Sequence, residues 1–244
     1  MFPLKDNIPT DRFPVVTVAL IALNAVVYFF LQDALLGLPD SGLGGDWPTP
    51  EYAAIPCELT GSSPCRTAPG GPPTAVTAFT SMFMHGSVLH IGGNMLFLWI
   101  FGNNVEDSMG RPAFVAFYLL GGLAAIAAQT VIDPGSEVPT IGASGAVAGV
   151  LGGYLLLFPH ARVVTVVFII FFFTIIELPA LLFLVIWFAQ QALFGYLDLM
   201  DPVGDSGGVA YFAHIGGFVF GLLAIRAFAR RRKAPPRPRL SYHR

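Results

Sequence analysis

The sequence predicts an all-α polytopic membrane protein that crosses the bilayer with six transmembrane helices. Of its 244 residues, 55% are hydrophobic and only 11% are charged, whereas about a quarter of the residues of a typical soluble domain are charged. The hydrophobic residues gather in runs long enough to cross about 30 Å of hydrocarbon. In addition, the basic residues fall almost entirely on one side of the predicted membrane.

Six apolar runs are predicted to span the membrane. They cover approximately Val15–Leu35, Thr80–Phe101, Phe114–Ile132, Ser144–Phe158, Pro179–Leu197 and Val209–Phe228. The fourth run is short and begins at a serine. A further apolar run, Val163–Ile176, has only 14 residues, is rich in β-branched and aromatic side chains, and is bounded by Arg162 and Glu177. We therefore expect it to be an interfacial or re-entrant segment rather than a seventh span.

The distribution of lysine and arginine predicts the orientation. With six spans both termini lie on one side, which then holds 12 of the 13 basic residues and leaves Arg66 alone on the other. Because basic loops favour the cytoplasm, we expect a cytoplasmic N-terminal segment at 1–12, a membrane domain at 13–230 and a basic cytoplasmic tail at 231–244. The basic run follows a hydrophobic segment, which is typical of a membrane anchor, so no nucleic-acid partner is expected.

The long outward loop, about 38–78, is rich in glycine and proline and contains both cysteines, Cys57 and Cys65. A disulfide between them is permitted on the non-cytoplasmic side of a membrane. Two free thiols in an exposed loop are the alternative.

Four polar side chains lie in or at the start of predicted spans, where polar groups are costly and therefore informative. Ser144 opens the fourth span in "GASGA", His90 and Asn94 lie in "LHIGGNM" of the second, and His214 lies in "FAHIGGF" of the sixth. The fourth and sixth spans both enter from the outer face. Ser144 and His214 can therefore share a level in the outer half of the membrane.

Glycines at four-residue spacing predict that the fourth and sixth helices pack closely. They are Gly145, Gly149 and Gly153 on the fourth helix, and Gly217 and Gly221 on the sixth. Such faces let transmembrane helices approach backbone to backbone, and His214 lies on the same stripe as the glycines of its helix. This packing would bring the imidazole to Ser144, giving a pair in which the base takes the hydroxyl proton and the serine attacks a carbonyl.

His90 and Asn94 are candidates for stabilising the oxyanion of such a reaction. They are four residues apart and so project from one helix face, and both can donate a hydrogen bond. The backbone N–H of Ser144, unpaired in the first turn of its helix, is a third candidate donor.

Each feature also has a simpler explanation. The serine could be an N-cap, the histidine a packed core residue, and the glycines packing devices. A zinc site made of His85, His90 and His214 is disfavoured, because His85 and His90 diverge around a helix. A small transporter would need intramembrane charges, for which Glu177 is the lone candidate. The combination of four polar residues on three helices favours a hydrolytic site.

Together these residues resemble the rhomboid family of intramembrane serine proteases in its six-helix bacterial form. The likeness covers about residues 13 to 230. It rests on Gly142-Ala143-Ser144-Gly145, on Ala213-His214 followed by Gly217 and Gly221, and on His85, His90 and Asn94 in "HGSVLHIGGN".

The resemblance implies a Ser144–His214 dyad with no third acidic member. It also implies an oxyanion and substrate-binding site formed by His90, Asn94 and the Ser144 backbone beside Gly142. The implied reaction cleaves transmembrane segments of other membrane proteins near the outer face, without metal or nucleotide, in a bacterial inner membrane. The rival is a rhomboid-like pseudoprotease that captures such segments without cutting them, and the presence of both dyad residues disfavours it.

Two positions depart from the family pattern. Some members carry an aromatic ring that stacks on the histidine, and the corresponding position here is Ala148, so Tyr211 or Phe212 is expected to steady the imidazole instead. Many members have a Trp-Arg pair in the first outward loop, but Trp47 has no adjacent arginine. A Cys57–Cys65 disulfide is expected to stiffen this loop in its place.

Overall fold

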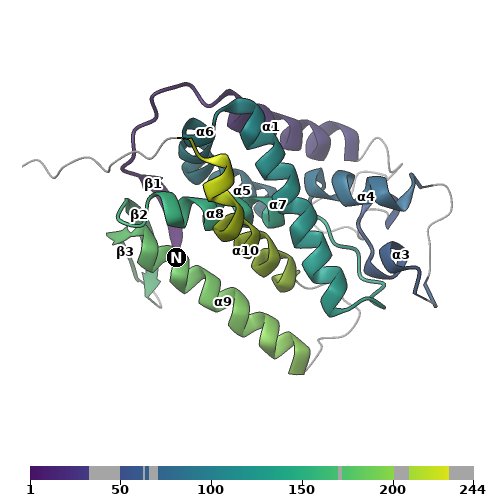
Figure 1. Ribbon diagram of the computed structural model, residues 1–244. Helices are drawn as coiled ribbons and strands as arrows, with labels where there is room; N and C mark the ends of the chain where they lie inside the picture. The colour runs from purple at the N-terminus through teal and green to yellow at the C-terminus, as the bar shows by residue number, and fades with distance from the viewer. Residues whose placement is uncertain (33–49, 63, 66–70, 170–171, 201–208, 231–244) are drawn as a thin grey trace, which may run out of the picture.

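The computed structural model describes residues 1–32, 50–62, 64–65, 71–169, 172–200 and 209–230. These residues form a helical bundle with a three-stranded sheet at one end (Figure 1). The helices are α1 (Val15–Val26, continued by the π-helical turn Val27–Gln32), α3 (Pro56–Thr60), α4 (Thr74–Thr80), α5 (Val88–Phe97), α6 (Asn103–Met109), α7 (Arg111–Ile132), α8 (Ser144–Leu157), α9 (Ala180–Met200) and α10 (Tyr211–Phe228). The strands are β1 (Phe2–Asp6), β2 (Arg162–Ile169) and β3 (Phe172–Pro179). Trp47, Arg66 and the predicted tail 231–244 lie outside the described residues.

Four helices in the described part of the chain are long and apolar enough to cross a membrane. They are Val15–Gln32, Arg111–Ile132, Ala180–Met200 and Tyr211–Phe228. The predicted second span begins later than expected, at Val88, and runs through a π-helical turn to Met109. Ser87 explains the late start, because its side chain accepts a hydrogen bond from the backbone N–H of His90 and so caps α5. The polytopic helical class is confirmed, and the count of six spans stays a prediction.

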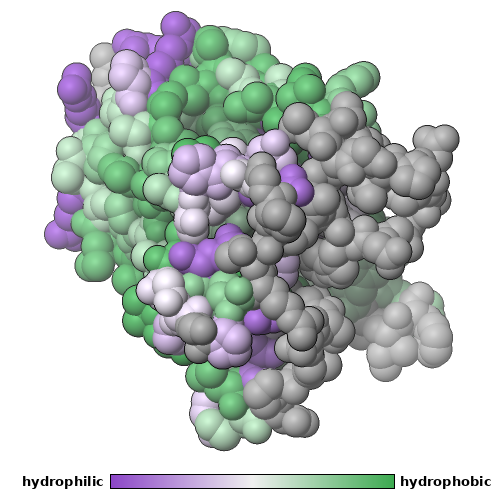
Figure 2. All heavy atoms as spheres, turned by 90° about the vertical axis from the view of Figure 1, so that its right-hand side faces the viewer, coloured by the Kyte–Doolittle hydropathy of each residue, from purple (hydrophilic) through white to green (hydrophobic). Residues whose placement is uncertain are grey.

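The two ends of the bundle differ in polarity. The sheet end carries the basic residues Lys5, Arg12, Arg111, Arg162 and Arg230, and we call it the basic end. The opposite end carries α3 and α4, and we call it the loop end. Viewed onto the loop end, hydrophilic residues gather near the middle of the surface and hydrophobic residues cover the flank (Figure 2). An apolar flank between two polar ends suits a protein embedded in lipid.

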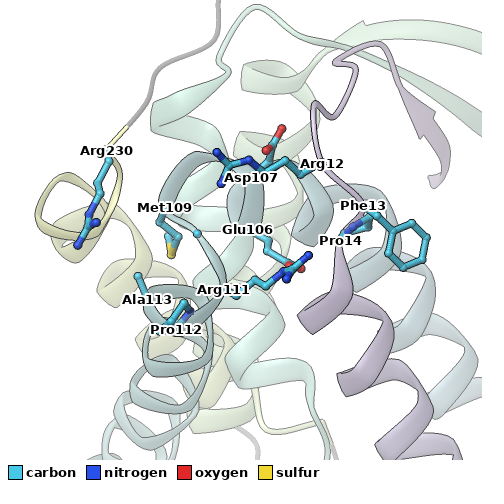
Figure 3. A pocket seen from close by; sticks show the side chains of 11 residues that line it. Arg12, Phe13, Pro14, Glu106, Asp107, Met109, Arg111, Pro112, Ala113 and Arg230 are labelled. Carbon is cyan, nitrogen blue, oxygen red and sulfur yellow. The ribbon is translucent and has the colours of Figure 1, made fainter.

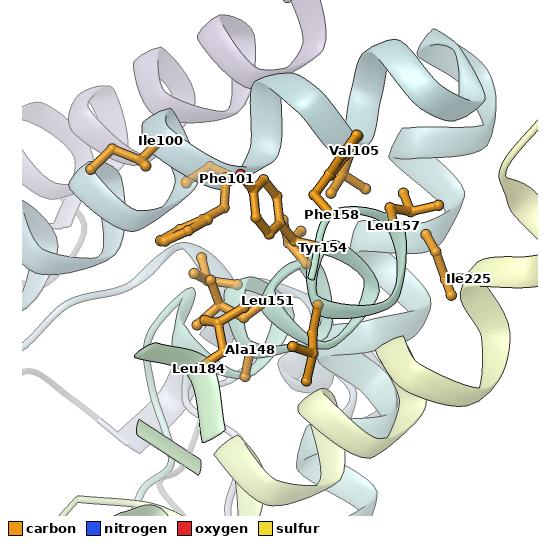
Figure 4. Close-up of a cluster of buried hydrophobic side chains, with 14 of the residues drawn as sticks. Ile100, Phe101, Val105, Ala148, Leu151, Tyr154, Leu157, Phe158, Leu184 and Ile225 are labelled. Atoms are coloured by element: carbon orange, nitrogen blue, oxygen red, sulfur yellow. The ribbon is translucent and has the colours of Figure 1, made fainter. Parts of the chain in front are cut away.

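α8 is the centre of the fold. Twelve of its 14 residues are buried, and Figure 4 shows its side chains, including Leu151 and Tyr154, packed with Phe101 and Val105 from the helical run 88–109. At 1.5 Å per residue a helix of this length spans about 21 Å, which is less than the ~30 Å of a hydrocarbon core. A helix this short cannot reach both membrane surfaces. Its first residue, Ser144, is partly buried.

α8 and α10 pack backbone to backbone through glycines. A Cβ atom added at Gly217 would collide with the carbonyl oxygen of Gly145, and one added at Gly221 would collide with that of Gly149. On its other side α8 meets α7, where a Cβ atom on Gly145 would collide with Ala125. This close approach fixes α10 against the start of α8.

In its described parts, 163–169 and 172–176, the apolar run 163–176 forms strands and not a seventh helix. β2 and β3 pair antiparallel from Arg162 opposite Pro179 to Ile169 opposite Phe172, and β1 pairs with the other edge of β2. The β-branched and aromatic residues of this run favour strands. On the edge strand β3, Phe172 and Phe173 are 79% and 69% exposed, and β3 leads directly into α9. A position for this hairpin in the membrane interface stays a prediction.

Glu106, at the basic end, holds the start of α1. Its carboxylate accepts hydrogen bonds from the backbone N–H groups of Val16 and Thr17, at 3.0 and 2.8 Å, and from the Thr17 hydroxyl at 2.8 Å. No side chain of α1 itself caps this end, so a residue 90 positions away satisfies its unpaired N–H groups. Glu106 lines a cavity of about 430 Å³. The cavity is also lined by three arginines of the basic end, namely Arg12, Arg111 and Arg230 (Figure 3).

Asp6 ties the N-terminal strand to the core. Its carboxylate accepts hydrogen bonds from the hydroxyl of Tyr154 on α8 and from the side-chain amide of Asn104, the latter at 2.8 Å. Burial of the carboxyl group raises the pKa of Asp6 to about 6. The strand β1 therefore reaches the base of α8 through a buried polar contact.

Candidate active site

Ser144 and His214 meet where α8 and α10 begin. The Nε2 atom of His214 lies 2.8 Å from the hydroxyl oxygen Oγ of Ser144, a hydrogen-bond distance. The two residues are 70 positions apart in the sequence. The glycine contacts between α8 and α10 hold the two helix starts at one level, which explains how such distant residues come together.

The Ser144 hydroxyl does not serve as the N-cap of α8. The N-cap position is occupied by Ala143, and no side chain caps this helix. Before it, Gly142 has φ +120, which L side chains rarely adopt, and a Cβ atom there would lie 2.7 Å from Nε2 of His90. Gly142 is therefore required both by its backbone conformation and by the space that His90 fills.

A cavity of about 760 Å³ opens beside the serine–histidine pair. Its walls include Ser144, His214, His90, Asn94 and Trp187. Four of these are the polar residues that the sequence picks out, and the structure brings all four to one space. The volume is ample for a segment of extended peptide chain with water.

His90 and Asn94 present donors to this cavity. The Nδ1 atom of His90 accepts a hydrogen bond from the backbone N–H of Gly86, at 3.4 Å, which leaves the ring proton on Nε2. The side-chain nitrogen Nδ2 of Asn94 is buried and has no hydrogen-bond partner among the described residues. A buried donor without a partner is costly in a folded protein. The unpaired Nδ2 donor of Asn94 is consistent with a group that hydrogen-bonds to a ligand atom.

His85 supports His90 from behind. The two rings meet edge to face, with their centroids 5.0 Å apart. The backbone of His85 is in turn held by Gln32, whose side-chain amide both donates to its carbonyl oxygen and accepts from its N–H, at 2.8 and 3.1 Å. Within the described ranges, no three or more His, Cys, Asp or Glu side chains are placed to hold a metal ion.

The ring that packs beside His214 comes from α9 and not from α10. Trp187 has its ring centroid 6.0 Å from that of the imidazole, at an interplanar angle of 36°. Tyr211, expected to take this role, packs instead against Phe194 at 5.7 Å. A long side chain leans towards the N-terminus of its own helix, so Tyr211, at the start of α10, extends away from His214.

Two glutamines near the site were missing from the sequence prediction. The side-chain oxygen Oε1 of Gln191, on α9, lies 2.8 Å from Nδ1 of His214. Gln129, on α7, accepts a hydrogen bond from the backbone N–H of Ala213 at 3.2 Å and so satisfies a donor in the first turn of α10. A polar amide inside an apolar helix is costly, as a histidine there is. The criterion that selects the histidines could therefore also have selected both glutamines.

The outward loop rests on the segment that leads to Ser144. A disulfide joins Cys57 and Cys65, and the backbone N–H of Cys57 donates to the carbonyl oxygen of Ser136 at 3.0 Å. Ala54 and Thr140 exchange two backbone hydrogen bonds at 3.2 and 2.8 Å. The loop therefore braces the chain just before the serine.

These observations define a class: polytopic membrane proteins with a serine–histidine pair and a buried unpaired donor beside it, inside a helical bundle. A family model for the rhomboid domain matches residues 72–231, about two thirds of the chain. The chain belongs to the rhomboid family, whose members are generally intramembrane serine proteases.

Individual relatives agree with this membership. The chain is 31% identical over 147 residues to presenilin-associated rhomboid-like protein, mitochondrial, of Mus musculus, a match that covers 58% of this chain and 35% of the relative. It is 35% identical over 97 residues to Rhomboid protein 1, mitochondrial, of Saccharomyces cerevisiae, covering 38% and 28%. It is 34% identical over 74 residues to RHOMBOID-like protein 5 of Arabidopsis thaliana, covering 30% and 24%. The chain thus spans about a third or less of these relatives.

These relatives overturn one expectation. The predicted location in a bacterial inner membrane is wrong, because the mouse and yeast relatives are named as mitochondrial proteins. The cause of the error is physical. A bias of basic residues distinguishes the two sides of a membrane, but it carries no information about which membrane holds the protein.

Proposed function

We propose that this chain is an intramembrane serine endopeptidase that cleaves transmembrane segments of other membrane proteins, in the half of the bilayer nearest the loop end. The observation that carries the proposal is the 2.8 Å contact between His214 Nε2 and Ser144 Oγ, at the wall of a cavity that also includes Asn94, whose buried Nδ2 donor has no partner among the described residues. A nucleophile, its base and an anion site are the three parts that acyl transfer requires.

The mechanism begins with proton transfer from Ser144 Oγ to His214 Nε2, while Oγ bonds to the carbonyl carbon of the substrate. The carbonyl oxygen becomes an oxyanion, held by hydrogen bonds from Asn94 Nδ2, from His90 Nε2–H and from the backbone N–H of Ser144. The C–N bond then breaks, and the imidazolium gives its proton to the leaving nitrogen. Water attacks the acyl-enzyme by the reverse proton path and frees Ser144.

The geometry of α8 supports cleavage within the membrane. α8 is too short to span the bilayer, so with its last turn at the basic-end surface it would place Ser144 below the loop-end surface, at the level of an incoming transmembrane segment. A helical substrate has its carbonyl oxygens bonded within the helix, so the scissile bond must leave the helix before Ser144 can attack it. Small and helix-breaking residues lower the cost of that step. Substrates of this composition are therefore proposed.

The names of the mouse and yeast relatives support a mitochondrial membrane as the location. β1 and the end of α10 would then share one side of it, since both lie at the basic end (Figure 1). The location is tested by expressing the full chain with a peroxidase tag in cells, where the tag labels the proteins around it. Absence of label from mitochondrial proteins would reject a mitochondrial location.

The test of the activity is cleavage of single-span model substrates by purified protein in detergent. Wild type is compared with Ser144→Ala and His214→Ala, and with His160→Ala as a matched control, since His160 is exposed in the turn after α8. We expect cleavage by wild type and by His160→Ala, and none by the two dyad variants. Turnover retained in Ser144→Ala would refute the proposal. Substrate binding without any Ser144-dependent cleavage would assign a capture role instead.

A further inference from the structure

The proposed dyad leaves one buried polar contact of His214 without a role. Gln191 is only 7% exposed, and its Oε1 atom lies 2.8 Å from His214 Nδ1, on the opposite side of the imidazole from Ser144. An amide inside a membrane bundle costs free energy unless it is hydrogen-bonded. Here its partner is the imidazole that the proposed reaction uses as a base.

We propose that Gln191 is the positioning residue of the dyad. It accepts a hydrogen bond from Nδ1–H of His214 and so keeps the lone pair of Nε2 directed at Ser144. This inference rests on the proposed function, because it assigns a role in the proton transfer between those two residues. Gln191 would be a neutral third member of the site, beside a Ser144–His214 dyad for which the family resemblance implies no acidic third member.

Neutral imidazole carries a single N–H proton. That proton sits on Nδ1 or on Nε2, and only the Nδ1 form can accept the proton of Ser144 at Nε2. An acceptor facing Nδ1 stabilises this form. With the amide reversed, its NH₂ group would donate to Nδ1 and drive the proton to Nε2, where it would point at Ser144 Oγ. The observed Oε1 contact is the arrangement that leaves His214 able to act as a base.

α9 supplies a second constraint on the same ring. Trp187 and Gln191 are four residues apart and share a face of α9, with the Trp187 ring 6.0 Å from the imidazole. The tryptophan limits tilting of the imidazole plane, and the glutamine limits rotation within that plane. On α8 the corresponding neighbour is Ala148, a methyl group with no ring and no hydrogen-bonding atom. Orientation of the base therefore depends on α9.

A neutral acceptor also suits this location. A carboxylate at position 191 would stabilise the imidazolium more strongly, but it would bring a charge into the membrane interior, where an ionised group is costly. The amide supplies the acceptor without the charge. Exchange of glutamine for glutamate should therefore change the pH dependence of the reaction in a direction that can be stated beforehand.

The experiment compares three variants of the full chain in detergent with a single-span model substrate, together with fluorophosphonate labelling of Ser144. Gln191→Met removes the acceptor and keeps the length of the side chain. Gln191→Glu keeps the acceptor and adds charge. Leu193→Met changes a side chain of the same helix that is 54% exposed and lies outside the walls of the cavity, and it is the control.

We expect Gln191→Met to lower kcat by about 10- to 100-fold with KM within about twofold, because a misoriented or wrongly protonated base impairs the chemical step alone. Gln191→Glu should remain active, and the acidic limb of its kcat/KM profile should move to higher pH, because a carboxylate favours the imidazolium. Leu193→Met should match wild type in both measurements.

Two results would overturn the inference. One is a Gln191→Met protein with wild-type kcat, and the other is a Gln191→Glu protein whose acidic limb does not move. The Gln191→Glu measurement tests the inference even if the Gln191→Met protein fails to fold. Wild-type protein that neither cleaves substrate nor reacts at Ser144 would instead reject the proposed function, so the two failures are distinguishable.

Discussion

Asn94→Ala should lower activity and leave folding stability unchanged or raised, and these two effects have separate physical causes. Asn94 is 8% exposed, and its Nδ2 atom has no hydrogen-bond partner in the described part of the chain. A buried donor in this condition costs about 1–3 kcal/mol. Removing the amide relieves that cost, and alanine is also the better helix former within α5.

Catalysis should respond in the opposite direction. Loss of one oxyanion donor typically lowers kcat by about 10²–10³-fold, or roughly 2.7–4 kcal/mol of transition-state stabilisation. Since the donor acts only on the developing oxyanion, kcat should fall with little change in KM. The measurement is kcat and KM on a single-span substrate, with thermal unfolding of the same preparations in the same detergent.

The matched control is Asn104→Ala, in the same helical run but at the basic end. Asn104 donates to Asp6 at 2.8 Å, so its replacement should lower the unfolding temperature and leave kcat within about twofold. The reasoning is refuted if Asn94→Ala loses stability and activity in parallel, because that pattern belongs to a structural residue. An unchanged kcat would remove Asn94 from the oxyanion site.

Four further outcomes are expected. Gly221→Ala should destabilise the fold by about 1–3 kcal/mol, since its Cβ would meet the backbone of α8, whereas Gly92→Ala, with open space around its Cβ, should not; thermal unfolding compares them. Glu106→Gln should lower the free energy of unfolding by about 1–2 kcal/mol, because charge-assisted bonds to the start of α1 are weakened. Burial raises the pKa of Asp6 from 3.8 to about 6, so the contribution of Asp6 to the stability of the wild type should be greatest below pH 3.8 and should fall by no more than about 3 kcal/mol as pH rises through 6; denaturation of Asp6→Asn should show no such loss. If the hairpin lies in the membrane interface, brominated lipid should quench the fluorescence of the tryptophan introduced by Phe172→Trp. Unquenched fluorescence of that tryptophan would place the hairpin in water.

The sequence predicts the polytopic helical class because that class depends on composition and on the length of apolar runs, which are local properties. It misplaces the start of the second span by eight residues, Val88 instead of Thr80. The apolar stretch before Val88 satisfies a hydropathy pattern equally well as helix or as loop, and the deciding feature is the Ser87 cap. It also leaves the shape of the hairpin open, because pairing between β1 and β2 joins residues about 160 positions apart.

One part of the candidate site could likewise be predicted from the sequence, and another part could not. Ser144 and His214 could be brought together from the sequence because four-residue glycine spacing specifies close helix contact. The contacts of Gln191 and Trp187 with His214 could not be predicted in this way, since the rotation of α9 about its axis follows from side-chain packing that no spacing rule encodes. Glu106 is a third case, because its role depends on α1, a helix 90 residues earlier.

The two helices that flank His214 hold it by different kinds of contact, and this difference has a mechanical consequence. α10 meets α8 through backbone atoms at glycines, so the backbones that carry Ser144 and His214 can move apart only if two rigid helices separate. α9 meets α10 through large rings, with Phe188 stacked on Phe218 at 4.7 Å and Trp187 at 5.9 Å from the same ring, and much of its outer face is exposed apolar surface, including Leu182 and Val185. Contacts between long side chains tolerate shifts that backbone contacts do not. Displacement of α9 should therefore leave the serine and the histidine neighbours and release the imidazole from Gln191, which makes orientation of the base more easily lost than its proximity.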